Sequence, residues 1–167
     1  MTTQEPVTAA QPESEGELRA RLALEELGLA GQIRRHGRVS SLAEAAAARG
    51  VEPGSLIKTM VVRRAADDYV LVLVPGDRQI SWPKLRALLG VNRLSMPDAD
   101  TAKAATGYER GTITPLGAHG GWPIIADERV TGTISIGGGG HGVGISLDAD
   151  ELLAAIAATR ADVTDPE

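Results

Sequence analysis

The chain has 167 residues, 43% of them hydrophobic, and this size suits a single domain with one core. The absence of cysteine excludes disulfides, thiolate metal sites and a cysteine nucleophile, and the net charge of −5 argues against a protein that grips long nucleic acid by its phosphates. No apolar run approaches the roughly 20 residues of a membrane span, and the N-terminus lacks the basic and apolar regions of a signal peptide, so we expect a cytoplasmic protein.

The N-terminal part divides into a polar tail and a helix. Residues 1–14 are polar and rich in Thr, Pro, Gln and Glu, which predicts a disordered tail. Ser14 and Glu17 have the spacing of a capping box, so a helix begins here and is expected to end near Gly28 or Gly31. The apolar residues that predict its amphipathic face are Leu18, Leu22, Leu24, Leu27 and Leu29.

A strand, a helix and a hairpin are expected next. Residues 33–39 predict a short strand that carries an arginine cluster, and Ser41 caps an alanine-rich helix closed by Gly50. The apolar residues 56–63 and 69–74 flank an Ala-Ala-Asp-Asp turn and predict two antiparallel strands.

The second half continues the mixture of strands and helices. Since it lacks strict βαβ alternation, we expect an α/β (α+β) fold, a single domain over residues 15–164 with a mixed sheet flanked by helices. The predicted strands are 91–95, 124–126, 132–136 and 144–147; the predicted helices are 81–89, 98–105 and 149–158, after which the chain is expected to fray; residues 107–123 are expected to form a loop.

Lys58 is the first candidate functional residue, because it interrupts the apolar strand Leu56–Val62. A lysine in a mostly buried strand needs an anion, a carbonyl or water near its ammonium group. The alternative is a lysine whose aliphatic stem lies along the sheet while its charge reaches solvent.

The glycine-rich segment Gly137–Gly144 contains G-x-G-x-x-G, but a strand follows it, so it is not a dinucleotide fingerprint. We expect a hairpin whose backbone approaches a ligand closely, or a merely flexible turn. His141 in this segment is a candidate site residue or an exposed bystander. The three histidines have no metal-ligand spacing, so neither a metal nor a cofactor is expected.

The order of these motifs resembles the YbaK/ProX family of aminoacyl-tRNA deacylases, which are related to the editing insertion domain of bacterial prolyl-tRNA synthetase. The motifs are SLIKTM at Ser55–Met60, VLVLVPGD at Val70–Asp77, TGYERGTITPLG at Thr106–Gly117, and the glycine-rich turn. The resemblance covers roughly residues 17–164. It implies a largely antiparallel, curved mixed sheet like that of the editing domain.

The resemblance also implies roles for individual residues. Lys58 matches the essential, catalytic lysine of the family, and Gly111 with Pro115 matches the G-x-x-x-P loop that is associated with the tRNA acceptor end. His141 becomes a candidate for selecting the amino acid, so His141→Ala is expected to change the substrate profile. The implied substrate-binding residues are Gly107, Tyr108, Gly111, Pro115, Gly117, Gly137, Gly138 and His141.

The implied function is trans-editing, the hydrolysis of the ester bond of a mischarged aminoacyl-tRNA, with Cys- or Ala-tRNA(Pro) as expected substrates. The expected partners are the acceptor end of aminoacyl-tRNA and prolyl-tRNA synthetase, with no membrane and no DNA. Lys58 and glycine N–H groups would stabilise negative charge on the carbonyl oxygen. Two alternatives stay open: a non-catalytic tRNA- or synthetase-binding module of this fold, and a small-molecule binder with the glycine-rich loop as a lid.

Overall fold

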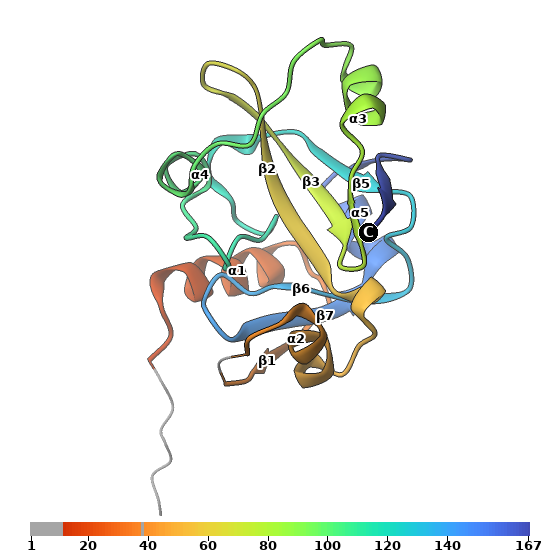
Figure 1. Ribbon diagram of the computed structural model, residues 1–167. Coiled ribbons are helices and arrows are strands. Elements are labelled where there is room, and N and C mark those ends of the chain that lie inside the picture. Colours follow the sequence, from red (N-terminus) through yellow and green to blue (C-terminus); the bar gives the residue numbers. More distant parts are fainter. Residues whose placement is uncertain (1–11, 38) are drawn as a thin grey trace, which may run out of the picture.

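The computed structural model describes residues 12–37 and 39–167, so most of the predicted disordered tail lies outside the described residues. The described chain forms short helices and strands in a mixed order (Figure 1). The helices are α1 (Glu15–Glu26), α2 (Leu42–Arg49), α3 (Trp82–Leu89), α4 (Ala99–Thr106) and α5 (Ala149–Ala155), with 3-10 turns η1 (Pro53–Ser55) and η2 (His119–Gly121). The strands are β1 (Gln32–Arg35), β2 (Ile57–Ala65), β3 (Asp68–Pro75), β4 (Arg78–Ile80), β5 (Ile124–Asp127), β6 (Thr133–Gly137), β7 (Val143–Asp148), β8 (Thr159–Ala161) and β9 (Thr164–Pro166).

The strands form three sheets. The largest has the order β2-β3-β5-β8, in which β2 and β3 are antiparallel and the remaining pairs are parallel. A second, antiparallel sheet has the order β1-β7-β6, and β4 pairs with β9. In Figure 1 the long β2–β3 hairpin stands over β6 and β7, and α2 lies beside β1 on the opposite side of that pair. The predicted α/β class with a mixed sheet is confirmed.

Each α-helix begins after a polar residue that caps it, as its sequence predicts. The side chain of the capping residue accepts a hydrogen bond from the N–H group three residues later, which satisfies one of the free donors of the first turn. These capping residues are Ser14, Ser41, Ser81, Asp98 and Asp148.

The core lies on both faces of the β2–β3 hairpin. β3 is buried almost throughout because α3 and the C-terminal segment at Val163 lie on one side of it and the smaller sheet with α1 and α5 lies on the other. Aliphatic side chains fill both layers, as expected for a chain without phenylalanine. No helix among the described residues is long and apolar enough to cross a bilayer.

The predicted apolar face of α1 is wrong in part. Leu24 is buried, but Leu18 and Leu22 are 40% and 49% exposed, while Glu17 and Ala20 face the protein. Glu17 is buried because its carboxylate pairs with the guanidinium group of Arg35 and lies against the glycine-rich segment. The helix therefore packs on the core through Ala20 and Leu24 and buries the Glu17 ion pair on the same face, an orientation that the leucine pattern alone does not predict.

Other predicted elements are also corrected. Residues 91–95 form no strand but a single bridge, in which Ser95 pairs with Arg63. Of the strand predicted at 33–39, residue 38 lies outside the described residues, and the observed strand is Gln32–Arg35. The last helix ends at Ala155. The chain then does not fray: Thr159–Ala161 and Thr164–Pro166 each add a strand to a sheet.

Candidate active site

A cavity of about 550 Å³ lies along β2, between that strand, α4 and the loop that follows α4. Its volume falls in the range of small-ligand sites. A second hollow of about 170 Å³ adjoins it. Lys58, Met60 and Met96 line both, so Lys58 stands between the two hollows. The remaining lining of the larger cavity comes from Arg49, Leu56, Ile57, Thr59, Val61, Pro97, Asp98, Ala99, Ala102, Arg110, Gly111, Ile113 and Gly137.

The main chain of β2 has an open edge in this cavity. β2 is the outer strand of its sheet, and Arg63 N–H donates to Ser95 O at 2.8 Å on the side away from β3. Main-chain groups alternate sides along an antiparallel strand, so those of Thr59 and Val61 also point away from β3. Since Thr59 and Val61 line the cavity, their N–H and C=O groups face a ligand placed there.

Both ends of this edge are closed by other parts of the chain. Leu56, just before β2, forms a parallel bridge with Ser135 of β6, and Arg63 pairs with Ser95. Within residues 12–37 and 39–167, the main-chain groups on this edge of β2 that have no hydrogen-bond partner are therefore confined to the segment that lines the cavity. Such groups can bind a carbonyl oxygen or an ammonium group with fixed geometry.

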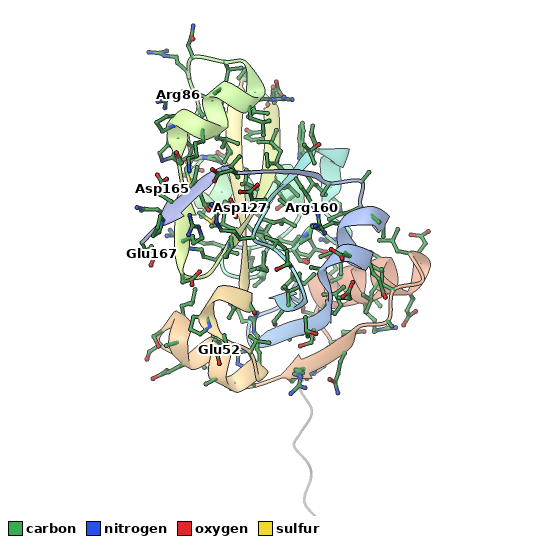
Figure 2. The ribbon with its side chains drawn as sticks, turned by 90° about the vertical axis from the view of Figure 1, so that its right-hand side faces the viewer. Glu52, Arg86, Asp127, Arg160, Asp165 and Glu167 are labelled. Carbon is green, nitrogen blue, oxygen red and sulfur yellow. The ribbon has the colours of Figure 1, made fainter. Side chains whose placement is uncertain are left out.

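Lys58 has its side chain on the opposite face from Thr59, since side chains alternate along a strand. Its Nζ donates to Arg78 O at 2.8 Å and lies 3.4 Å from a carboxylate oxygen of Glu167. Figure 2 shows Glu167 at the surface near Asp165. The Lys58 side chain is 26% exposed, so its ammonium group is accessible at the boundary of the two hollows. A carbonyl and a carboxylate are the kinds of partner that a lysine in a mostly buried strand needs.

Some residues of the motif at 106–117 line the cavity, and others are buried in the structure that supports the cavity wall. Gly111 lines the cavity, whereas Pro115 is buried away from it. Tyr108 is 1% exposed and its hydroxyl donates to Leu116 O at 2.5 Å. Burial raises the pKa of Tyr108, so the phenol stays neutral.

Gly107 and Gly117 lie around the same tyrosine. The guanidinium carbon of Arg19 stands 4.8 Å from the centre of the Tyr108 ring, and Arg19 donates to Gly107 O at 3.2 Å. A side chain at Gly117 would come within 3.0 Å of Arg19. The structure thus places Gly107, Tyr108 and Gly117 in a packed junction with α1 and does not bring them into the cavity.

The glycine-rich segment is also a packing junction. A side chain at Gly137 would come within 2.7 Å of Ile113 O, and one at Gly142 within 2.6 Å of His36 O. Gly138 N–H donates to Val143 O at 2.9 Å, inside the turn. Of the predicted site residues in this segment, only Gly137 lines the cavity. The N–H groups that face the cavity are therefore those of β2 and not those of the glycine-rich turn.

His141 lies at the rim and does not line the cavity. Its side chain is 70% exposed and Nε2 lies 3.2 Å from a carboxylate oxygen of Glu109. The pKa of Glu109 is lowered by this hydrogen bond and by Lys103. A side chain added at Gly111 would approach the His141 ring to 3.7 Å, which places the histidine beside the mouth of the cavity.

Two arginines of the lining were not among the predicted site residues. Arg110 is exposed at the mouth and Arg49 is half-buried at the other end. Arg49 ends an alanine-rich helix and Arg110 lies inside the quoted motif, and neither position differs in sequence from an ordinary surface arginine. Within residues 12–37 and 39–167, no group of three or more His, Asp or Glu side chains could hold a metal ion.

Comparisons with known proteins identify the family of this chain. Residues 36–155 match the family described as the aminoacyl-tRNA editing domain. A candidate Cys-tRNA(Pro)/Cys-tRNA(Cys) deacylase, EbsC of Enterococcus faecalis, is 27% identical over 71% of this chain and 73% of its own length. The proline–tRNA ligase of Bacillus velezensis is 35% identical over 92 residues, which are 55% of this chain but only 16% of the ligase.

A solved structure shares almost the whole fold. It is described as a candidate trans-editing enzyme for prolyl-tRNA synthetase, with a TM-score of 0.83, 26% identity, and coverage of 91% of this chain and 98% of its own. The resemblance expected from the motifs is confirmed by these matches. Since the family match covers most of the chain, this protein belongs to the aminoacyl-tRNA editing domain family.

Proposed function

We propose that this protein is a trans-editing aminoacyl-tRNA deacylase, which hydrolyses the ester bond between a wrong amino acid and the acceptor end of a tRNA. The observation that carries the proposal is the cavity, in which Lys58, the open edge of β2 and Gly111 meet in a chain of the editing family. The names of the relatives in turn favour Cys-tRNA(Pro) as a substrate and prolyl-tRNA synthetase as a partner. Such a protein would act in the cytoplasm, where aminoacylation takes place.

The chemistry needs an attacking water and stabilisation of the negative charge that develops on the carbonyl oxygen. The sheet holds the N–H groups of Thr59 and Val61 roughly 7 Å apart, so one of the two donates to that oxygen, and it needs no reorganisation to do so. Water adds to the carbonyl carbon, the tRNA hydroxyl leaves with a proton, and the free amino acid is released. A hydroxyl of the terminal nucleotide can assist, so the site can work without a protein nucleophile.

Lys58 would contribute its positive charge at the boundary of the two hollows. Its present contacts with Arg78 O and Glu167 fix the ammonium group beside the cavity, and a substrate would share or replace the Glu167 contact. Removal of one such stabilising donor typically lowers a rate by about 100- to 1000-fold.

One observation favours a second candidate function. Because the Lys58 ammonium group already has two partners, it could serve only as a contact for phosphate or ribose in a non-catalytic binding module. The two functions differ in turnover and not in binding.

The test is the hydrolysis of a panel of mischarged tRNAs by the wild type and by Lys58→Ala, with Lys103→Ala as the matched control. Lys103 is an exposed lysine of α4 that does not line the cavity. We expect the wild type to deacylate at least one member, Lys58→Ala to lose about 100-fold or more in kcat/KM, and Lys103→Ala to lose little. Folding is checked by thermal unfolding. Binding of tRNA by wild type and mutant, without hydrolysis by either, would instead support the binding module.

A further inference from the structure

Arg49 points into the cavity from the end of α2, and all its partners are neutral. Its Nε donates to His36 Nε2 at 3.3 Å, and its Nη1 lies 3.5 Å from Ser135 Oγ and 3.4 Å from Ile136 O. His36 Nδ1 lies 2.8 Å from Gly37 O, which fits a neutral imidazole whose Nδ1 carries the proton and whose Nε2 accepts. No carboxylate in the described part of the chain pairs with Arg49.

This guanidinium group is charged and partly removed from water. Burial lowers the pKa of Arg49 from its ordinary value, but an arginine stays protonated at neutral pH. A buried charge is costly unless an opposite charge and hydrogen bonds compensate for it. The contacts of Arg49 are long for hydrogen bonds and include no negative charge, so its strongest possible partner is not in the described chain.

Gly144 provides the space for this side chain. A Cβ at Gly144 would lie 2.7 Å from both Cδ and Nε of Arg49 and 3.0 Å from Cζ. The guanidinium group therefore lies in a slot on β7 that any other residue would narrow. A slot that fixes a planar donor group is suited to a planar or tetrahedral oxyanion, which arginine binds with two parallel hydrogen bonds.

The rest of the cavity lining is also positively charged. Lys58 and Arg110 add two positive charges, and Asp98 is the single acidic residue of the lining. The Asp98 carboxylate is engaged as the cap of α4, where it accepts from Thr101 N–H at 2.8 Å. The cavity thus favours an anionic ligand, although the protein as a whole is acidic.

We propose that Arg49 is a substrate-binding residue that holds a phosphate group of the terminal nucleotide of the tRNA while the ester lies against the open edge of β2. The inference rests on the proposed function, because it takes the acceptor end as the ligand. The same chemistry could be supplied by the carboxylate side chain of an acidic aminoacyl group, and the experiments separate the two.

The first experiment measures binding and needs no turnover. Dissociation constants for adenosine 5′-monophosphate and for adenosine are compared in the wild type and in Arg49→Gln. We expect the wild type to bind the phosphate-bearing probe about 10- to 100-fold more tightly, as a charge-assisted pair allows, and Arg49→Gln to bind both probes nearly equally. An unchanged preference in the mutant would overturn the proposal.

The second experiment measures hydrolysis of aminoacyl esters of adenosine with and without the 5′-phosphate. Arg49→Gln is expected to lose about 10- to 100-fold in kcat/KM on the phosphate-bearing esters only. An equal loss on both esters would show a structural role, and a loss confined to aspartyl and glutamyl esters would show a carboxylate ligand; both results contradict the proposal. If the wild type hydrolyses no ester or tRNA, the proposed function fails while the binding comparison still decides the role of Arg49.

Two further variants are matched controls. Gly144→Ala keeps the charge of Arg49 but displaces its guanidinium group, so an intermediate loss of the phosphate preference is expected. Arg93→Gln removes an exposed arginine that does not line the cavity, and no change is expected. Thermal unfolding of each variant shows whether it is folded under the assay conditions.

Discussion

Asp127 and Arg49 are two charged side chains withdrawn from water, and their surroundings differ completely. The carboxylate of Asp127 is fully buried and accepts from Val163 N–H at 3.1 Å, Thr164 Oγ1 at 2.9 Å and Arg129 N–H at 3.0 Å. The Arg129 guanidinium group adds an ion pair at 3.2 Å. In Figure 2 Asp127 is labelled in the middle of the protein, where the C-terminal segment passes it.

Arg49 has the opposite arrangement, with long contacts to neutral groups only. The difference shows what each charge does. A buried charge whose partners are all supplied by the chain stabilises one fold, and its removal is felt in stability. A partly buried charge that has no oppositely charged partner in the chain can form its strongest ion pair with a bound ligand. The following variants test this distinction, beginning with the largest effect.

Asp127→Ala is expected to destabilise the protein by about 3–5 kcal/mol, because it leaves Val163 N–H, Thr164 Oγ1 and Arg129 N–H without the carboxylate that accepts from them. The free energy of unfolding in urea measures this. Asp165→Ala is the matched control: this residue of the same C-terminal segment forms a half-exposed pair with Lys84, so about 1 kcal/mol or less is expected. Equal effects would show that the Asp127 network does not hold the C-terminal strands in place.

Thr59→Val tests the same distinction, between groups with and without a partner in the chain, at an uncharged side chain. Thr59 Oγ1 is buried and has no hydrogen-bond partner within the described residues. Replacing the hydroxyl with a methyl group is therefore expected to leave the free energy of unfolding unchanged or to raise it by up to about 1 kcal/mol. Thr106→Val is its counterpart, because Thr106 Oγ1 donates to Ala102 O at 2.8 Å and its loss is expected to cost about 1–2 kcal/mol. A clear loss of stability in Thr59→Val would reveal a partner for the hydroxyl, such as a bound water.

His141→Ala is expected to have the smallest effect. The sequence favoured a role in selecting the amino acid, but the side chain is exposed at the rim and its partner is Glu109. We therefore expect little change in kcat/KM for any aminoacyl group. The mischarged tRNA panel checks this, and a changed order of preference would assign His141 to the site after all.

Much of the fold follows from local sequence signals. The capping residues Ser41 and Asp98 and the β2–β3 hairpin were predictable because each depends on neighbours in the chain. The failures depend on distant contacts. Glu17 of α1 pairs with Arg35, and β9 pairs with β4 while Thr164 Oγ1 donates to Asp127. No local pattern contains these partners.

The candidate site shows the same division. The motifs pointed to Lys58, Gly111 and Gly137, which the structure brings to one cavity. The place of Arg49 in the cavity could not be predicted, because its side chain occupies space that only a glycine at position 144 leaves free. Gly144 lies far from Arg49 in the sequence. The open main-chain groups of β2 were also beyond prediction, since the sequence does not say which strand is the outer one.

The glycine-rich segment has a consequence for how this protein can vary. It looks like a low-complexity stretch, of the kind that usually tolerates sequence change, yet a side chain added at its glycines would collide with α1, His36, Ile113 or Arg49. Each of these positions is constrained by a different neighbour, so no single compensating change elsewhere could relieve them together. Among homologues that keep this arrangement, we expect the segment to be among the slowest to diverge, and insertions to collect instead in the exposed loops.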